Sequence, residues 1–257
     1  MAFLWIAAVI LLMGCCVVCA LVWHRGPLIW LYGRRLASLP GNAAQYSPEA
    51  VTRVEGSALA GKHIIFLGSS VTYGAAAMGV SFADYVCART GATMTKEAVS
   101  GTTLADDRPD SYVARLKRLD GSIPADLFVC QLSTNDASQQ KPLGAVSPDG
   151  DYDTATVAGA IEFIISYAKD TWNCPVVFYT NPRYGNESYA AMVRLLGEIA
   201  RKRGVAVADL WNDVEFNDIS AGQRALYMAD AIHPTRAGYL EWWTPYLETV
   251  FEEVISK

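Results

Sequence analysis

Short apolar runs alternate with longer segments of helical periodicity from Gly61 onward. The strongest runs span residues 64–67, 127–132, 175–179 and 205–208, and a weaker one lies around 93–99. Apolar runs without polar alternation are typical of strands that are covered on both faces, as in parallel sheets. The alternation therefore predicts a single α/β domain with a parallel sheet over residues 61–257.

Helix candidates lie between and after these runs. They span residues 82–89, 112–119, 157–168, 187–203 and 236–254. Asp110 is the candidate cap of the second helix, and Gly204 follows basic residues at the end of the fourth, as is common at helix C-termini. Pro245 is expected to kink or break the last helix. Ligand sites in such sheets lie beyond the carboxyl ends of the strands, where the polar turns of this chain are of most interest.

The first residues form a different kind of segment. Residues 2–23 contain no charged side chain. At a rise of about 1.5 Å per residue, a helix of this length spans a hydrocarbon core of roughly 30 Å. We therefore expect residues 1–24 to be an uncleaved, single-pass membrane anchor. A cleaved signal peptide is the alternative, but the apolar run is long for one and no Lys or Arg precedes it.

Residues 25–60 are punctuated by turn sequences and are expected to connect this anchor to the domain. Arg25, Arg34 and Arg35 follow the apolar run, and the positive-inside rule would then place the domain in the cytoplasm. Single N-terminal anchors also precede exported domains, so the side of the membrane stays open. The oligomeric state is equally open.

Charge and cysteine content exclude several classes of function. The formal net charge is −5 and there is no long basic run, so we expect no nucleic-acid partner. Three of the six cysteines lie in the apolar run, and the others are Cys87, Cys130 and Cys174. Their spacing fits neither a disulfide framework nor a zinc site. We therefore expect no bound metal.

Four polar turns follow strand candidates or precede the last helix. They are Gly-Ser-Ser-Val-Thr-Tyr-Gly at 68–74, Ser-Gly-Thr-Thr at 100–103, Ser-Thr-Asn-Asp at 133–136 and Asp-Ala-Ile-His-Pro at 230–234. Each is weak evidence by itself, because Gly, Ser, Asn and Asp are ordinary turn residues. The first turn is no Walker phosphate loop, since no Lys follows at the required spacing.

His233 is the histidine best placed to act as a base. Of the three histidines, His24 flanks the apolar run, and His63 begins the first strand and so lies at the opposite end of the sheet. Asp230, three residues before His233, can orient the imidazole and stabilise its cation. The alternative, a helix-entry turn in which Asp230 only caps, is equally good for these residues alone.

Taken together and in this order, the four turns resemble the sequence blocks of the SGNH or GDSL hydrolase family of lipases and esterases. Ser70, Gly101 and Asn135 match the Ser, Gly and Asn of the first three blocks, and Asp230 with His233 matches the last. The resemblance covers roughly residues 63–239. Ser69 stands where the family name has Asp, and Ser133 replaces the usual Gly, which makes substrate preference less certain than activity.

The resemblance implies a three-layer α/β/α fold of flavodoxin-like type and hydrolysis of esters without metal or cofactor. Ser70 would attack the acyl carbonyl with His233 and Asp230 completing a triad, and an acyl-enzyme would form. The oxyanion would bind the backbone N–H groups of Ser70 and Gly101 and the Asn135 amide. Family substrates include lipids, acetylated sugars, thioesters and small acyl esters.

Two further readings remain open. One is an acyltransferase that uses the same triad, and the other is a non-catalytic binding domain on the same fold, since a fold does not determine function. Four aromatic residues are candidates either for an acyl or sugar pocket or for the core, and the core is the commoner place. They are Tyr184, Trp211, Trp242 and Trp243.

Overall fold

The structure is a computed structural model that describes residues 33–257. Its centre is a five-stranded sheet of order β2-β1-β3-β4-β5, in which every neighbouring pair is parallel. The strands are β1 (His63–Gly68), β2 (Thr93–Ala98), β3 (Leu127–Gln131), β4 (Val176–Tyr179) and β5 (Ala206–Ala208). The predicted parallel sheet is confirmed, with strand ends that differ from the predicted ones by a residue or two.

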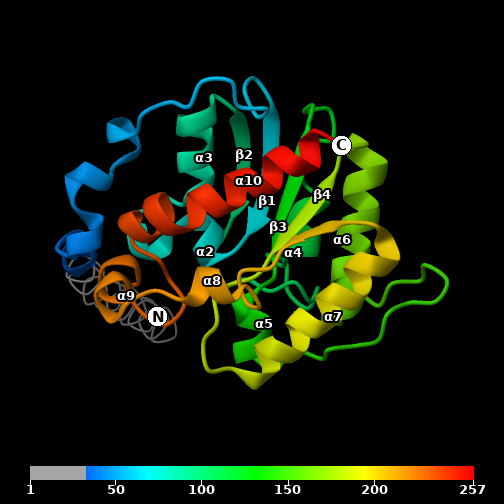
Figure 1. The fold of residues 1–257 in the computed structure, drawn as a ribbon. Coiled ribbons are helices and arrows are strands. Elements are labelled where there is room, and N and C mark those ends of the chain that lie inside the picture. Colours follow the sequence, from blue (N-terminus) through cyan, green and yellow to red (C-terminus); the bar gives the residue numbers. More distant parts are fainter. Residues whose placement is uncertain (1–32) are drawn as a thin grey trace, which may run out of the picture.

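Helices cover both faces of the sheet and give three layers (Figure 1). Alternate side chains of a strand point to opposite faces, so Ile65 and Phe128 pack against one helical layer and Phe66 and Val129 against the other. The first layer contains α4 (Tyr112–Leu116), α6 (Val157–Trp172) and α7 (Glu187–Arg203). The second contains α3 (Phe82–Thr90) and α10 (Thr244–Ile255).

The predicted cap of α4 is wrong. Ser111, not Asp110, is the N-cap, because the Ser111 hydroxyl accepts a hydrogen bond from Ala114 N at 3.0 Å. The Asp110 carboxylate instead binds the Arg108 guanidinium. The helix is also shorter than predicted and ends at Leu116.

The last helix departs from the predicted 236–254 in an informative way. A π-helical turn, Gly238–Trp243, precedes α10, and Pro245 lies in the first turn of α10. Proline has no N–H and is tolerated in a first turn, so the break comes before Pro245 instead of at it. The Thr244 hydroxyl donates to the carbonyl oxygen of Tyr239 at 2.7 Å, which satisfies an acceptor within the irregular turn.

The described part of the predicted connector packs on the domain. Leu36, Asn42 and Leu59 are buried, and the Tyr85 hydroxyl donates to the carbonyl oxygen of Tyr46. The predicted anchor, residues 1–24, lies outside the described residues. Between residues 33 and 257, no helix has both the length and the apolar character needed to cross a bilayer.

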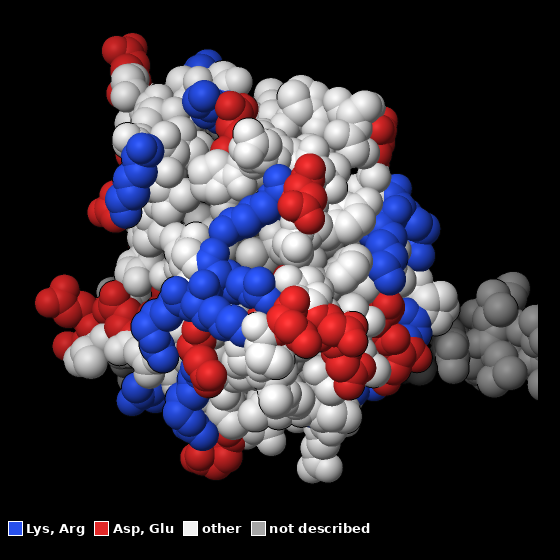
Figure 2. All heavy atoms as spheres, turned by 90° about the vertical axis from the view of Figure 1, so that its right-hand side faces the viewer, with Lys and Arg blue, Asp and Glu red and all other residues white. Residues whose placement is uncertain are grey.

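The face formed by α6 and α7 carries charges of both signs (Figure 2). Beneath it, the Glu162 carboxylate is fully buried and accepts from Arg203 Nη2 at 2.7 Å and from Ser147 N at 2.7 Å. Buried charges are stable only when paired and hydrogen-bonded. This cluster therefore fixes the loop that contains Ser147 to both helices and is structural.

Candidate active site

Ser70 lies directly beyond the carboxyl end of β1, as the first residue of the short helix α2 (Ser70–Tyr73). Gly68, the last residue of β1, permits this tight turn. A Cβ at Gly68 would lie 1.7 Å from the Thr72 hydroxyl oxygen, which is far too close for any side chain. Ser69 is the single residue that connects the strand to the helix. The side chain that follows it, Ser70, is buried but not sealed off, with 7% of its surface exposed.

Gln131, the last residue of β3, braces this turn. Its side-chain oxygen accepts hydrogen bonds from Ser69 N at 2.9 Å and from the Thr72 hydroxyl at 2.9 Å. It also lies 3.3 Å from the Ser69 hydroxyl, which is fully buried. The two adjacent serines thus have different surroundings: Ser69 faces Gln131 in the interior, and Ser70 faces the site.

His233 meets Ser70 across the site. The distance from Ser70 Oγ to His233 Nε2 is 2.8 Å, and His233 Nδ1 lies 2.8 Å from Asp230 Oδ2. The Asp230 carboxylate also accepts from the backbone N–H groups of Ile232 and His233, at 2.8 Å each. Hydroxyl, imidazole and carboxylate therefore form a continuous chain of the kind in which a carboxylate orients an imidazole base.

Asp230 is the charged member of this chain. Partial burial raises the pKa of its carboxyl, but the hydrogen bonds from His233 and Ile232 and the His233 charge outweigh burial and lower the pKa to about 2. Hydrogen bonds to the ionised form of a carboxyl favour that form. Asp230 is therefore ionised at neutral pH and can stabilise a protonated His233.

Two side chains from distant segments hold the turn that contains His233. The Asn181 amide, just beyond β4, donates to the carbonyl oxygen of Ile232 at 3.1 Å. Asn42 binds the other side: its oxygen accepts from Arg236 N at 2.9 Å, and its amide donates to the carbonyl oxygens of Leu36 and Ala76, at 2.8 Å each. Ala76 follows Ser70 by six residues, so Asn42 joins the serine segment to the histidine segment.

Gly101 and Asn135 border the site beyond β2 and β3. Gly101 has φ +82°, a backbone conformation that favours glycine. A Cβ at this position would have no atom within 4 Å, so the backbone conformation, and not a lack of space, explains the glycine. Asn135, on α5 (Thr134–Ser138), donates from its amide to the carbonyl oxygen of Thr102 at 2.9 Å, which leaves a second amide hydrogen available. Within residues 33–257, the backbone N–H groups of Ser70 and Gly101 donate to no other protein group.

The buried carboxylate of Asp136 fastens α5 to the segment after Gly101. It accepts from the backbone N–H groups of Leu104 and Ala105, at 2.8 and 3.0 Å. Burial raises the pKa of Asp136, and these hydrogen bonds oppose that increase. Because Asp136 follows Asn135 directly, the amide of Asn135 and the loop of Gly101 are held together.

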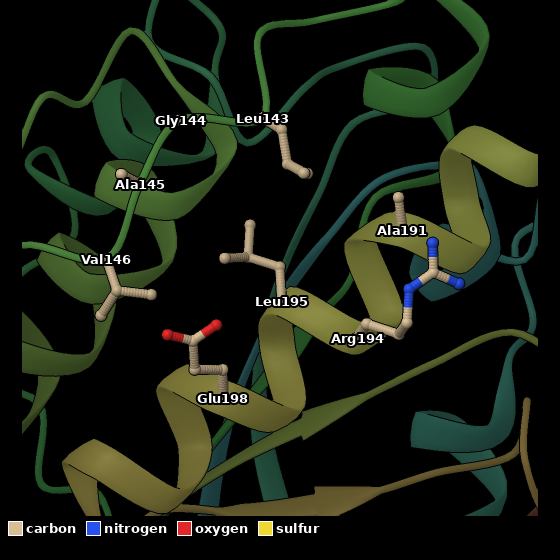
Figure 3. Close-up of a pocket in the computed structure, with 8 residues that line it drawn as sticks. All are labelled: Leu143, Gly144, Ala145, Val146, Ala191, Arg194, Leu195 and Glu198. Carbon is tan, nitrogen blue, oxygen red and sulfur yellow. The ribbon is translucent and has the colours of Figure 1, made fainter.

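A hollow of about 400 Å³ lies elsewhere, between the loop at Leu143 and α7 (Figure 3). Of the described residues that line it, Arg194 and Glu198 are the only ionisable ones, and none carries a hydroxyl, thiol or imidazole. It therefore offers no serine, cysteine or histidine for nucleophilic catalysis. No group of three or more His, Cys, Asp or Glu side chains able to hold a metal ion occurs in the chain from residue 33 onward.

The structure thus brings Ser70, His233 and Asp230 into hydrogen-bonded contact, with Gly101 on a neighbouring loop and Asn135 in the first turn of α5. The four aromatic candidates pack instead with the hydrophobic cores. Sequence reasoning missed Asn42, Asn181 and Gln131. Only Gln131 carried a signal, because it is a polar residue in an otherwise apolar strand.

Comparisons with known proteins identify the family and the fold. The sequence model of the GDSL-like lipase/acylhydrolase family matches residues 66–240. No curated protein matches the chain.

Solved structures share the fold. A Lactobacillus plantarum protein is 22% identical with a TM-score of 0.64, covering 76% of this chain and 98% of its own. A candidate GDSL-like lipase from Bacteroides ovatus is 18% identical with a TM-score of 0.57, covering 76% and 99%. An acetyl-xylooligosaccharide esterase from Geobacillus is 19% identical with a TM-score of 0.54, covering 77% and 95%.

Proposed function

Since the chain belongs to the GDSL-like lipase/acylhydrolase family, we propose that it is a serine-dependent ester hydrolase that acts through an acyl-enzyme. The observation that carries the proposal is the hydrogen-bonded chain from Ser70 Oγ to His233 Nε2, at 2.8 Å, and from His233 Nδ1 to Asp230, at 2.8 Å. A hydroxyl within hydrogen-bond reach of an oriented imidazole is the arrangement that activates a serine nucleophile.

The proposed reaction has two halves. Ser70 Oγ attacks the acyl carbonyl carbon while His233 Nε2 takes the hydroxyl proton, and Asp230 stabilises the resulting imidazolium. His233 then gives the proton to the departing alcohol, which leaves the acyl group on Ser70. Water, deprotonated by His233, attacks this acyl-enzyme, and the imidazolium gives the proton back to the Ser70 oxygen as the bond to the acyl group breaks and the acid is released.

Three donors are proposed to bind the negative oxygen of the tetrahedral intermediates. They are the backbone N–H groups of Ser70 and Gly101 and the free hydrogen of the Asn135 amide. Among the described residues, neither backbone N–H has an acceptor, which supports this role. Loss of one such donor costs about 3–4 kcal/mol of transition-state stabilisation in serine hydrolases.

Small acyl esters and acetylated sugars are the first substrates to test. The Geobacillus structure that shares the fold is an acetyl-xylooligosaccharide esterase. At this low identity the similarity shows a shared fold and does not show a shared substrate. Therefore p-nitrophenyl esters of several chain lengths should be compared with acetylated xylo-oligosaccharides.

Labelling with a fluorophosphonate tests the proposal directly. We expect one adduct on Ser70, and Ser70→Ala should abolish both labelling and ester turnover. Ser69→Ala is the matched control, because the Ser69 hydroxyl faces Gln131 and not His233. An adduct on Ser69, or near-normal turnover by Ser70→Ala, would overturn the assignment of the nucleophile.

We also propose that residues 1–24 anchor the protein in a membrane, on the basis of the uncharged run from Ala2 to Trp23. The full chain should then sediment with membranes and resist extraction by high salt and by alkaline carbonate. Release by either treatment would contradict an integral anchor.

A further inference from the structure

Arg115 is a fully satisfied guanidinium buried beneath the candidate active site. Its side chain is 3% exposed. Arginine has five N–H donors in a fixed planar arrangement, and all five find acceptors here. Nε donates to the carbonyl oxygen of Asp110 at 3.0 Å, and Nη1 donates to the Glu97 carbonyl oxygen and carboxylate at 2.9 and 3.1 Å.

The remaining nitrogen, Nη2, joins two segments of the site. It donates to the carbonyl oxygen of Gly68 at 2.8 Å and to the Thr102 hydroxyl at 3.0 Å. Gly68 precedes the turn that contains Ser70, and Thr102 directly follows Gly101. One planar group therefore sets the spacing between the two loops whose N–H groups are the proposed oxyanion donors.

Thr102 extends this link to the third donor. The carbonyl oxygen of Thr102 accepts from the Asn135 amide at 2.9 Å and from the Ser133 hydroxyl at 3.3 Å. The Thr102 hydroxyl, which accepts from Arg115, donates in turn to the carbonyl oxygen of Val99 at 2.7 Å. Arg115 thus contacts, directly or through Thr102, the segments that carry Ser70, Gly101 and Asn135.

We propose that Arg115 is a positioning residue that holds the three oxyanion donors in register, an inference that rests on the proposed function of this site. Such donors must lie within about 3 Å of the oxyanion, and errors of about 0.5 Å weaken a site of this kind. Arg115 touches none of the reacting atoms, so it acts through the loops that it joins.

The carbonyl oxygen of Gly68 accepts hydrogen bonds from two segments, of which Arg115 is one. It also accepts from Val99 N, at 3.2 Å, so β1 and the end of β2 meet at the atom that Arg115 binds. The nitrogen of a lysine would lie one bond short of the Nη2 position, so from the same backbone it is farther from Gly68 O and the Thr102 hydroxyl, and it has too few donors to serve Asp110 and Glu97 as well. Arg115→Lys therefore keeps the charge beside Glu97 while removing the link.

The test compares Arg115→Lys with the parent enzyme on p-nitrophenyl acetate. We expect kcat to fall roughly 10- to 100-fold, below the loss for removing a whole oxyanion donor, with little change in KM. The control is Arg89→Lys, since Arg89 binds Glu248 at 2.7 Å in a partly buried ion pair between α3 and α10. It should lower the melting temperature and leave kcat unchanged.

A second pair of measurements keeps the inference testable if Arg115→Lys folds poorly. Thr102→Val removes only the hydroxyl that accepts from Arg115 Nη2 and donates to Val99, and should lower kcat roughly tenfold. Glu97→Gln removes the carboxylate charge but leaves the links to Gly68 and Thr102, and should retain near-normal kcat. A parental kcat in Thr102→Val, or an equal loss in Glu97→Gln, would overturn the inference.

Hydrogen exchange tests the positioning role of Arg115 without any substrate. In Arg115→Lys the amide of Val99, which donates to the carbonyl oxygen of Gly68, should exchange roughly tenfold faster than in the parent, while the amides of α6 are unchanged. Equal exchange at Val99 would refute the positioning role.

A parent that hydrolyses no ester would refute the proposed function alone, whereas an active parent with unchanged kcat in Arg115→Lys would refute this inference alone.

Discussion

Replacing Asn42 by alanine should destabilise the domain although Asn42 lies outside the region that carries the catalytic motifs. The side chain is 4% exposed and makes three hydrogen bonds, with Leu36 O, Ala76 O and Arg236 N. A buried hydrogen bond contributes about 1 kcal/mol, and a partner left unsatisfied costs about 1–3 kcal/mol.

Water admitted to the vacated space would satisfy part of this set, so we expect a loss of about 3 kcal/mol in the free energy of unfolding. With a urea m-value of about 3 kcal/mol/M, the unfolding midpoint should fall by about 1 M. Ester turnover should fall as well, because Ala76 and Arg236 lie in the segments of the proposed nucleophile and base.

Asn212→Ala is the matched control, because the Asn212 amide makes an exposed hydrogen bond to nearby Asp209. Surface changes of this kind usually stay within about 0.5 kcal/mol. Urea unfolding followed by circular dichroism measures both variants. If Asn42→Ala shifts the midpoint no further than Asn212→Ala does, the cross-link contributes nothing and the reasoning fails.

Four other predictions concern the triad and the start of the chain. Ser70→Ala should reduce kcat by several orders of magnitude and Ser69→Ala far less, as measured by steady-state kinetics. Because the pKa of Asp230 is lowered to about 2, the pH profile of kcat/KM between pH 4 and 9 should contain no ionisation of Asp230, and two acid-limb ionisations would contradict this assignment. The same lowering stabilises the fold above the ordinary pKa of 3.8, so the stability difference between parent and Asp230→Asn should shrink as pH falls from about 4 to about 2. A fragment that begins at residue 33 should fold and retain activity, whereas one that begins at residue 56 lacks Leu36 and Asn42 and should have a lower melting temperature; equal melting temperatures would show that residues 33–55 are dispensable.

The sheet could be predicted because its three central strands, β1, β3 and β4, are buried on both faces. Runs such as 64–67 are continuously apolar for that reason, and their order of appearance predicted the parallel connections. Strand and helix ends were less predictable, since Ser111 and Asp110 are both good cap residues and only the backbone geometry selects Ser111. The π-helical turn before Pro245 likewise depends on packing that no local pattern records.

The candidate site could likewise be predicted only in part. Ser70, Asp230 and His233 stand in short local motifs, and the sequence was sufficient to name them as candidates. Gln131 and Arg115 act on partners 62 and 47 residues away, and Asn42 on Arg236, 194 residues away. Their roles follow from the three-dimensional arrangement, so motif spacing could not reveal them.

The separation of Ser70 from His233 also has a consequence for protein synthesis. The two residues are 163 positions apart, and α10, after His233, packs Phe251 against Phe66 of β1. At about 5–20 residues per second, translation makes the serine turn roughly 10 to 30 s before the histidine. A nascent chain interrupted anywhere in that interval has no imidazole facing its serine. Ester cleavage would thus begin only on chains whose last segment has left the ribosome and closed over the first strand.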